Sequence, residues 1–285
     1  MTGSEPTTAT AAAALARSAV SAGRRSRGPS IALRVVLVVG FGVLVVAVLE
    51  LLTATRVISP LLMPRPSVVA ARLSTILGEI VTGGPTAIYA WETASALLIS
   101  LVAALVIGIA IGTLLAQSRL AKLVLYPYVL ALNAAPRIVF APMFVIWFGL
   151  GLLSRVVMAV SIGMFPVIVG TLAGLARAEG QTHKLMSAAG ATRLQRFRLV
   201  EFPSALPYIV AGAETASVLV AVGVVIGEFT AGNDGLGYLV IAAQENYDLP
   251  TVFALVIIIS VMGMLLNGLV TLVGRRLVFW GRATR

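Results

Sequence analysis

Several residue types that support chemistry are absent or scarce in this chain. Its 285 residues include no Cys and a single His, His183. The missing thiols exclude disulfides, thiolate metal ligands and a cysteine nucleophile, and one histidine cannot build a multi-histidine metal site. No paired carboxylates gather near one face either. The sequence therefore predicts no catalytic residue, no cofactor and no metal site.

Charged residues are also scarce. They make up 11% of the chain against 59% hydrophobic residues, whereas a soluble domain carries about 25% charged residues. Long unbroken apolar runs favour helices over barrel strands, in which polar and apolar residues alternate. The sequence predicts an all-α integral membrane protein. Its net charge of +10 is typical of basic cytoplasmic loops, and we expect no nucleic-acid partner.

Six stretches are long enough to cross a bilayer as helices. The polar residues 1–30 before them are expected to form a disordered cytoplasmic tail rather than a signal peptide. A transmembrane domain is expected over 31–280, and the third span is long enough for a broken or tilted helix. The spans are predicted at about 31–52, 87–116, 123–148, 156–176, 207–231 and 250–273.

The basic residues orient these spans. With the N-terminus inside, sixteen Arg and Lys residues fall in cytoplasmic segments and four fall outside, namely Arg56, Arg65, Arg72 and Arg155. Because cytoplasmic loops are enriched in Lys and Arg, we expect a multi-pass protein of the bacterial plasma membrane with both termini in the cytoplasm. Residues 60–73 are interpreted as a surface connector and 232–248 as an acidic outer loop.

Glycines recur at four-residue spacing in several spans, as in Gly108/Gly112, Gly170/Gly174 and Gly223/Gly227. Small residues let helix backbones approach closely in lipid. We interpret these pairs as intramembrane packing positions.

The longest cytoplasmic segment, 177–206, contains "GATRLQRFRLVEFPSALP" (190–207) between two apolar spans. A short helix is expected over 183–189, with a turn at Gly190 and a second helix through 193–202 that ends before Pro203. By charge alone, the segment could simply enforce topology.

The spacing of Gly190, Val200, Phe202 and Pro203 resembles the cytoplasmic loop motif of binding-protein-dependent ABC importer permeases. That motif begins with E-A-A, where this chain has Lys184, Leu185 and Met186. "APMFVIWFGLG" (141–151) and "GEFTAGNDGLGYLV" (227–240) resemble the nitrate, sulfonate and taurine group of that family. The resemblance covers roughly residues 35–280, and for residues 60–73 it implies an outer helix after the P-x-P turn as the alternative to a surface connector.

The resemblance implies the type I importer permease fold, with a coupling helix that docks on a cytoplasmic ATPase dimer. It also implies a second copy of the chain and an extracytoplasmic solute-binding protein as partners. ATP hydrolysis is expected on the partner, because neither Lys122 nor Lys184 follows a Gly-rich phosphate loop. The coupling residues implied are Lys184, Ala188, Ala189, Gly190, Ala191, Thr192, Arg193 and Pro203.

The implied solute is a small anionic organic molecule, such as an aliphatic sulfonate or taurine, or nitrate. A vitamin precursor of the thiamine or riboflavin type is the alternative. A different class of protein, an ion-coupled transporter or channel that needs no ATPase, stays open from the residues alone.

Ionisable residues inside spans mark functional sites by default. Candidates for the translocation pathway are Asn133, Arg137, Glu214 and Glu228. Arg137, beside Pro136, could attract an anion, or it could pair internally. Glu214 and Glu228 lie about 21 Å apart on one helix and within about 40° of the same face; hydrogen bonds between helices are the other interpretation. Glu92, beside Trp91, is interpreted as an interfacial anchor.

Overall fold

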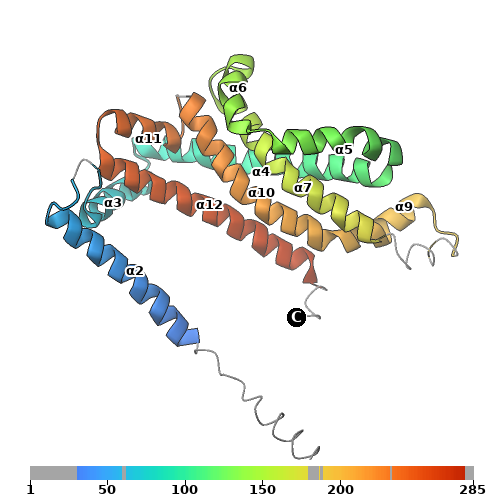
Figure 1. Ribbon diagram of the computed structural model, residues 1–285, viewed down its shortest axis with the longest axis horizontal. Coiled ribbons are helices and arrows are strands. Elements are labelled where there is room, and N and C mark those ends of the chain that lie inside the picture. Colours follow the sequence, from blue (N-terminus) through green and yellow to red (C-terminus); the bar gives the residue numbers. More distant parts are fainter. Residues whose placement is uncertain (1–30, 60–61, 179–185, 187–188, 232, 280–285) are drawn as a thin grey trace, which may run out of the picture. The chain divides into compact units, whose positions relative to one another are not determined.

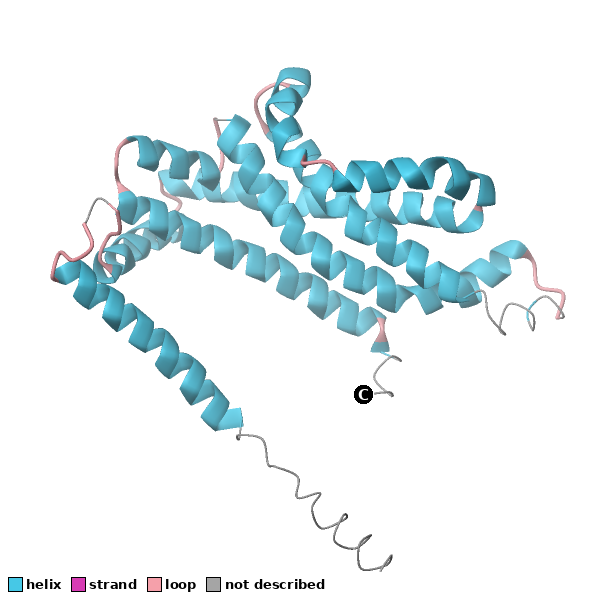
Figure 2. Ribbon diagram, viewed as in Figure 1, coloured by secondary structure: helices cyan, strands magenta, loops and turns pink. Residues whose placement is uncertain are grey.

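The structure, a computed structural model, describes residues 31–59, 62–178, 186, 189–231 and 233–279, with the side chains of 31, 32 and 34 left out. The chain divides into two compact units, 1–57 and 58–285. The first contains one described helix, α2 (Ile31–Ala54), whose residues Val35–Ala54 have a mean hydropathy of 2.9. Figure 2 shows helices and loops in the described chain and no strand, so the predicted all-helical fold is confirmed.

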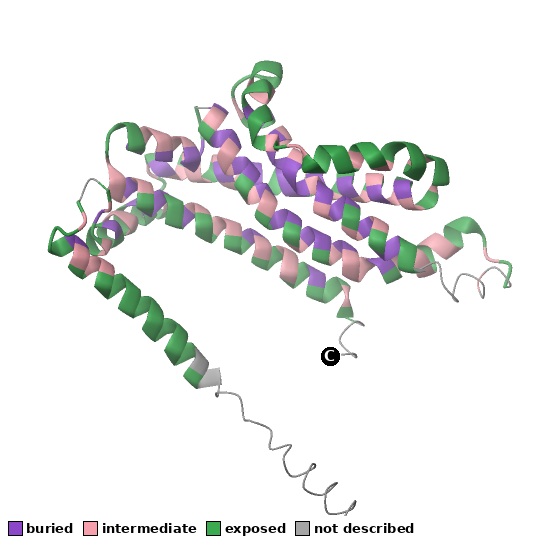
Figure 3. Ribbon diagram, viewed as in Figure 1, coloured by how far each residue is buried: buried purple, intermediate pink, exposed green. Residues whose placement is uncertain are grey.

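The second unit is built on four long helices, α4 (Pro85–Gln117), α7 (Leu152–Ala178), α10 (Phe202–Ala231) and α12 (Leu249–Leu277). α7 packs along both α4 and α10, and α12 packs on the other side of α10 (Figure 1). The buried residues in Figure 3 follow the facing sides of these helices, where Leu97, Ala159 and Val220 belong to one apolar cluster.

Glycines set the distance between the central helices. A Cβ added at Gly170 would lie 2.6 Å from the backbone oxygen of Tyr208, and one at Gly212 would lie 2.6 Å from that of Pro166. Only hydrogen fits at such contacts, so α7 and α10 meet backbone to backbone. Gly170 is one of the predicted packing glycines, and it does serve as one.

Two shorter helices cover one end of this unit. α3 (Pro66–Thr82) packs on α12 and α4, and α11 (Leu236–Glu245) packs on α12, α10 and α4. The interpretation of 60–73 as a surface connector is therefore wrong. A proline at the first position starts α3, its Val69 and Ile76 are buried, and Arg72 Nε donates a hydrogen bond to Thr251 Oγ1 at 2.7 Å. The expected outer loop 232–248 likewise contains the helix α11.

The predicted third span is broken. α5 (Arg119–Ala134) is followed by a 3₁₀ turn (Arg137–Phe140) and by α6 (Ala141–Phe148), and the two halves meet at an angle of 87°. Within the described residues, five helices are long and apolar enough to cross a membrane, or six if this bent pair counts as one span. The break falls at Pro136, which cannot donate a backbone hydrogen bond to continue the helix.

The opposite end of the unit holds α9 (Arg193–Arg196), which continues through a π-helical turn (Phe197–Glu201) into α10. The expectation that this helix ends before Pro203 is wrong. Phe202 N–H donates to the carbonyl of Phe197, five residues back, and this wider turn leads the helix into Pro203 without a break. Arg193–Ala231 is thereby one helical rod of 39 residues.

Candidate functional site: a buried ionic cluster, a broken helix and a capped segment

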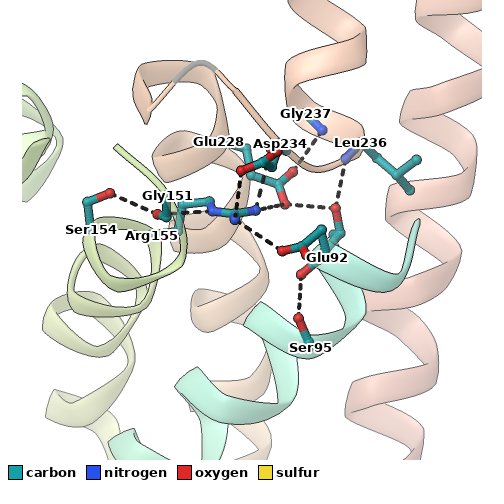
Figure 4. A network of polar contacts seen from close by, with 10 residues as sticks. Glu92, Ser95, Gly151, Ser154, Arg155, Glu228, Asp234, Leu236 and Gly237 are labelled. Atoms are coloured by element: carbon teal, nitrogen blue, oxygen red, sulfur yellow. Dashed lines mark hydrogen bonds and ion pairs between the residues drawn. The ribbon is translucent and has the colours of Figure 1, made fainter. Parts of the chain in front are cut away.

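Arg155, in the first turn of α7, is 1% exposed, and its guanidinium lies among three carboxylates (Figure 4). Its Nη2 lies 3.3 Å from Glu92 Oε2 on α4, and its Nη1 lies 3.6 Å from Glu228 Oε1 on α10. Nη2 is also 3.8 Å from Asp234 Oδ2, in the loop before α11. One cation therefore joins three helices and the loop.

Glu228 is fully buried, and each carboxylate oxygen has a further donor. Thr93 Oγ1 donates to Oε1 at 2.7 Å, and Gly237 N–H donates to Oε2 at 2.7 Å. Thr93 in turn accepts a hydrogen bond from Leu236 N–H at 2.8 Å. These contacts fasten the start of α11 to α4 and α10. We call the set the α11 cluster; it comprises Glu92, Thr93, Arg155, Glu228, Asp234, Leu236 and Gly237.

The Gly-rich sequence after α10 follows from this cluster. Gly235 has φ +92°, and a Cβ at this position would collide with the Glu228 carboxylate. A Cβ at Gly237 would come within 2.8 Å of Glu228 Oε2. The chain thus wraps around a buried carboxylate, which requires residues without side chains at these two points.

Two sequence interpretations change here. Arg155 was counted among the charges of an outer loop, but it is a buried helical residue with three acidic neighbours. Glu92 was interpreted as an interfacial anchor, but its carboxylate pairs with Arg155. A charge between two apolar runs looks like a loop residue in the sequence, and only the packing of α4, α7 and α10 places it inside.

Arg137 lies at the break between α5 and α6, and its guanidinium donates to protein oxygens. Nε donates to Leu132 O at 3.3 Å and Nη1 to Ile162 O at 3.2 Å. Both carbonyls lack their helical donor, because the residues four positions later are Pro136 and Pro166. One arginine thus satisfies two acceptors that two prolines leave free.

The remaining contacts of Arg137 hold it in place. Nη2 donates to both the backbone and the side-chain oxygen of Asn133, at 2.9 and 2.6 Å. The guanidinium carbon lies 4.2 Å from the centre of the Phe165 ring. The predicted pair Asn133 and Arg137 is therefore in contact, and most donors of this arginine already have protein acceptors.

The predicted coupling segment is described in part. Lys184 and Ala188 lie outside the described residues. Gly190 has φ +77°, the left-handed conformation that favours glycine, and Thr192 caps α9 reciprocally with Gln195. Arg193 is exposed, and Pro203 lies in the first turn of α10. The described part is a sharp turn followed at once by a capped, continuous helix.

Glu214 lies on α10, half-buried. Its backbone oxygen accepts hydrogen bonds from Ser217 and Asn267, but its carboxyl group has no hydrogen-bond or ion-pair partner among the described residues. The structure thus separates the two predicted acids of this helix, since Glu228 is buried and paired while Glu214 is neither.

Residues 104–279 match the family described as "Binding-protein-dependent transport system inner membrane component". This match covers more than half of the chain. The chain belongs to this family of permeases. The similarity of its cytoplasmic loop motif to ABC importer permeases is thereby confirmed at the level of the family, and the chain is a multi-pass membrane component of a transport system.

Individual relatives carry several substrate names. The chain is 35% identical over 167 residues to the formylaminopyrimidine permease ThiX of Halalkalibacterium halodurans, covering 59% of this chain and 67% of the relative. It is 34% identical to the riboflavin permease RibX of Chloroflexus aurantiacus, over 58% of this chain and 62% of the relative. The taurine permease TauC of Escherichia coli is 29% identical over 79% of this chain and 82% of its own length.

A solved structure has the same fold. The inward-facing MetNI methionine ABC transporter aligns with a TM-score of 0.55 and 23% identity, over 66% of this permease and 94% of that chain. This likeness supports the predicted type I importer architecture.

Sequence reasoning missed Arg155 and Thr93 as site residues, because their partners lie between 63 and 143 residues away along the chain.

Proposed function

We propose that this chain is the membrane subunit of an ATP-driven importer in which segment 189–203 couples the spans to a separate ATPase. One observation carries the proposal. The exposed α9 is continuous with α10, so a displacement applied at Arg193 reaches the far end of the rod at Ala231. A rigid helix transmits such a movement, whereas a loop would absorb it.

The partners follow from the same proposal. An ATPase dimer would bind the α9 end in the cytoplasm, and a solute-binding protein would meet the opposite end, where α3 and α11 lie. A second copy of the chain would complete the pathway. Both termini would then be cytoplasmic, in the orientation that the basic residues favour.

Two solute classes are candidates, small anions and vitamin precursors, and the geometry of Arg137 favours the vitamin precursors. An anionic solute was expected to use this arginine, but its guanidinium donates to Leu132, Asn133 and Ile162. A vitamin precursor with a nitrogen heterocycle needs no such cation. Relatives named for such solutes are also 34–35% identical to this chain, against 29% for the taurine permease.

Gly190 and Gly83 form a matched pair for testing the coupling segment. They have φ of +77° and +75°, and a Cβ at either would meet nothing within 4 Å. Alanine therefore adds the same strain at both positions, about 1 to 2 kcal/mol. We expect Gly190→Ala to lower co-purification of the ATPase, and ATP-driven uptake, by about fivefold or more.

Gly83 lies between α3 and α4, away from α9, so Gly83→Ala is the control and retains both activities. Charge reversal, Arg193→Glu, tests the exposed face of α9 separately. Equal ATPase recovery from wild type, Gly190→Ala and Arg193→Glu would remove the coupling role.

A further inference from the structure

Glu214 differs from three other ionisable side chains of the described membrane segments. Arg137, Arg155 and Glu228 all have protein partners, whereas the Glu214 carboxyl group has none in the part of the chain that the structure describes. It lies 12 residues into the 30 of α10, near the middle of that helix. An unpaired acid within a membrane span is costly, which points to a ligand.

A groove begins next to Glu214. It has a volume of about 630 Å³ and lies between α10 and α12, with Val218, Ala221 and Val225 on its α10 wall. Residues at these spacings share one helical face with Glu214, which lies one turn nearer to the start of α10. Glu214 is not itself a lining residue, but it lies on the same face of α10 and extends the groove as a stripe, one turn toward the start of the helix.

The polar groups along this stripe offer acceptors. Asn267, in the groove wall, uses its Nδ2 to donate to Glu214 O at 3.0 Å and to Ser217 Oγ at 2.9 Å, which leaves its Oδ1 as an acceptor. The hydroxyl of Ser260 donates to Val256 O at 2.7 Å. The other lining residues are apolar or glycine, including Phe229, and no Lys or Arg lines the groove.

Such a surface selects by charge and by hydrogen-bond direction. An alkanesulfonate without an amino group, or nitrate, carries only acceptors and a negative charge, so this surface repels it. A flat nitrogen heterocycle with amino groups offers N–H donors to Glu214 and Asn267 and an apolar ring to the remaining wall.

We propose that Glu214 and the α10–α12 groove form part of the solute pathway and favour neutral or cationic amino-substituted nitrogen heterocycles over organic anions. The proposal rests on the importer function proposed above and specifies the solute class of that pathway. Glu214 would accept hydrogen bonds from the amino group as the solute passes.

The test uses the full assembly of permease, ATPase and solute-binding protein from neighbouring genes, reconstituted in vesicles. ATP-driven uptake of labelled formylaminopyrimidine and of methanesulfonate, an anion without N–H donors, is measured for wild type, Glu214→Gln and Glu214→Leu. Glu245→Gln, at the exposed end of α11, is the control for the same chemical change. Co-purification of the ATPase reports assembly of each variant.

We expect wild type and Glu245→Gln to take up the aminopyrimidine and not methanesulfonate, and the Glu214→Leu variant to lose at least about tenfold of this uptake, with a smaller loss for Glu214→Gln. Uptake unchanged in both Glu214 variants, or uptake of methanesulfonate in preference to the heterocycle, overturns the inference. Failure of the wild-type permease to bind any ATPase would instead overturn the proposed function.

Discussion

Replacing Arg155 with Ala is expected to destabilise the protein by about 3 to 5 kcal/mol, because it leaves the buried Glu228 without its cation. The neighbouring Glu92 and Asp234 keep 35% and 49% of their side chains exposed, so water compensates them in part. The loss is measured as the free energy of unfolding in detergent, by denaturant titration or by the shift in thermal midpoint.

Two comparison variants give this result its meaning. Arg119→Ala removes an exposed arginine at the start of α5 and should change stability by less than about 0.5 kcal/mol. The double variant Arg155→Met, Glu228→Met removes both buried charges and should recover part of the loss. If Arg155→Ala alone were as stable as wild type, the ionic contacts of the α11 cluster would contribute nothing to the free energy of unfolding.

Replacing Arg137 with Ala is expected to cost about 2 to 4 kcal/mol. The variant leaves the largely buried Ile162 carbonyl without a donor, which alone costs about 1 to 3 kcal/mol, and removes the contact with Phe165. It also removes a cation from the C-terminal end of α5, where the helix dipole favours positive charge. Thermal unfolding of the purified variant measures the total loss of stability from these three contributions.

A double-mutant cycle isolates the role of the prolines. In Pro166→Ala the new backbone N–H can donate to Ile162 O, so Arg137→Ala should cost less in this background than in wild type. Pro127→Ala removes an exposed proline from α5 and should show no coupling with position 137. If the two prolines behave alike, Arg137 does not replace a missing helical hydrogen bond.

Hydropathy was enough to predict the helical class, because each long apolar run crosses one bilayer thickness and has no other stable conformation in lipid. Hydropathy did not mark α3, for which only the family resemblance offered a helix as the alternative to a connector. The sequence of α3 mixes Arg72, Ser74 and Glu79 with apolar residues. This composition is typical of a surface connector, although Val69 and Ile76 are buried. Amphipathic helices that pack at the end of a bundle are not marked by hydropathy.

The contacts of the candidate sites were also predictable only in part. Local sequence indicated the turn at Gly190 and placed Asn133 one helical turn before Arg137, the spacing at which the two are found in contact. It could not indicate that Arg137 reaches Ile162 or that Arg155 reaches Glu228, since these contacts depend on how α7 packs against its neighbours. Pairing of charges over such separations is a property of the packed structure.

The sharp bend between α5 and α6 also limits what can surround this part of the molecule. Ala135 and Pro136 lie outside any helix, although Ala135 N–H donates to Ala131 O and Pro136 O accepts from Val139 N–H, and Pro136, Ile138 and Val139 are exposed in the single chain. Hydrocarbon tails cannot hydrogen-bond to peptide groups, so irregular backbone within a membrane span survives only beside water or another polypeptide. We therefore expect this side of the molecule to be shielded from lipid in the working transporter.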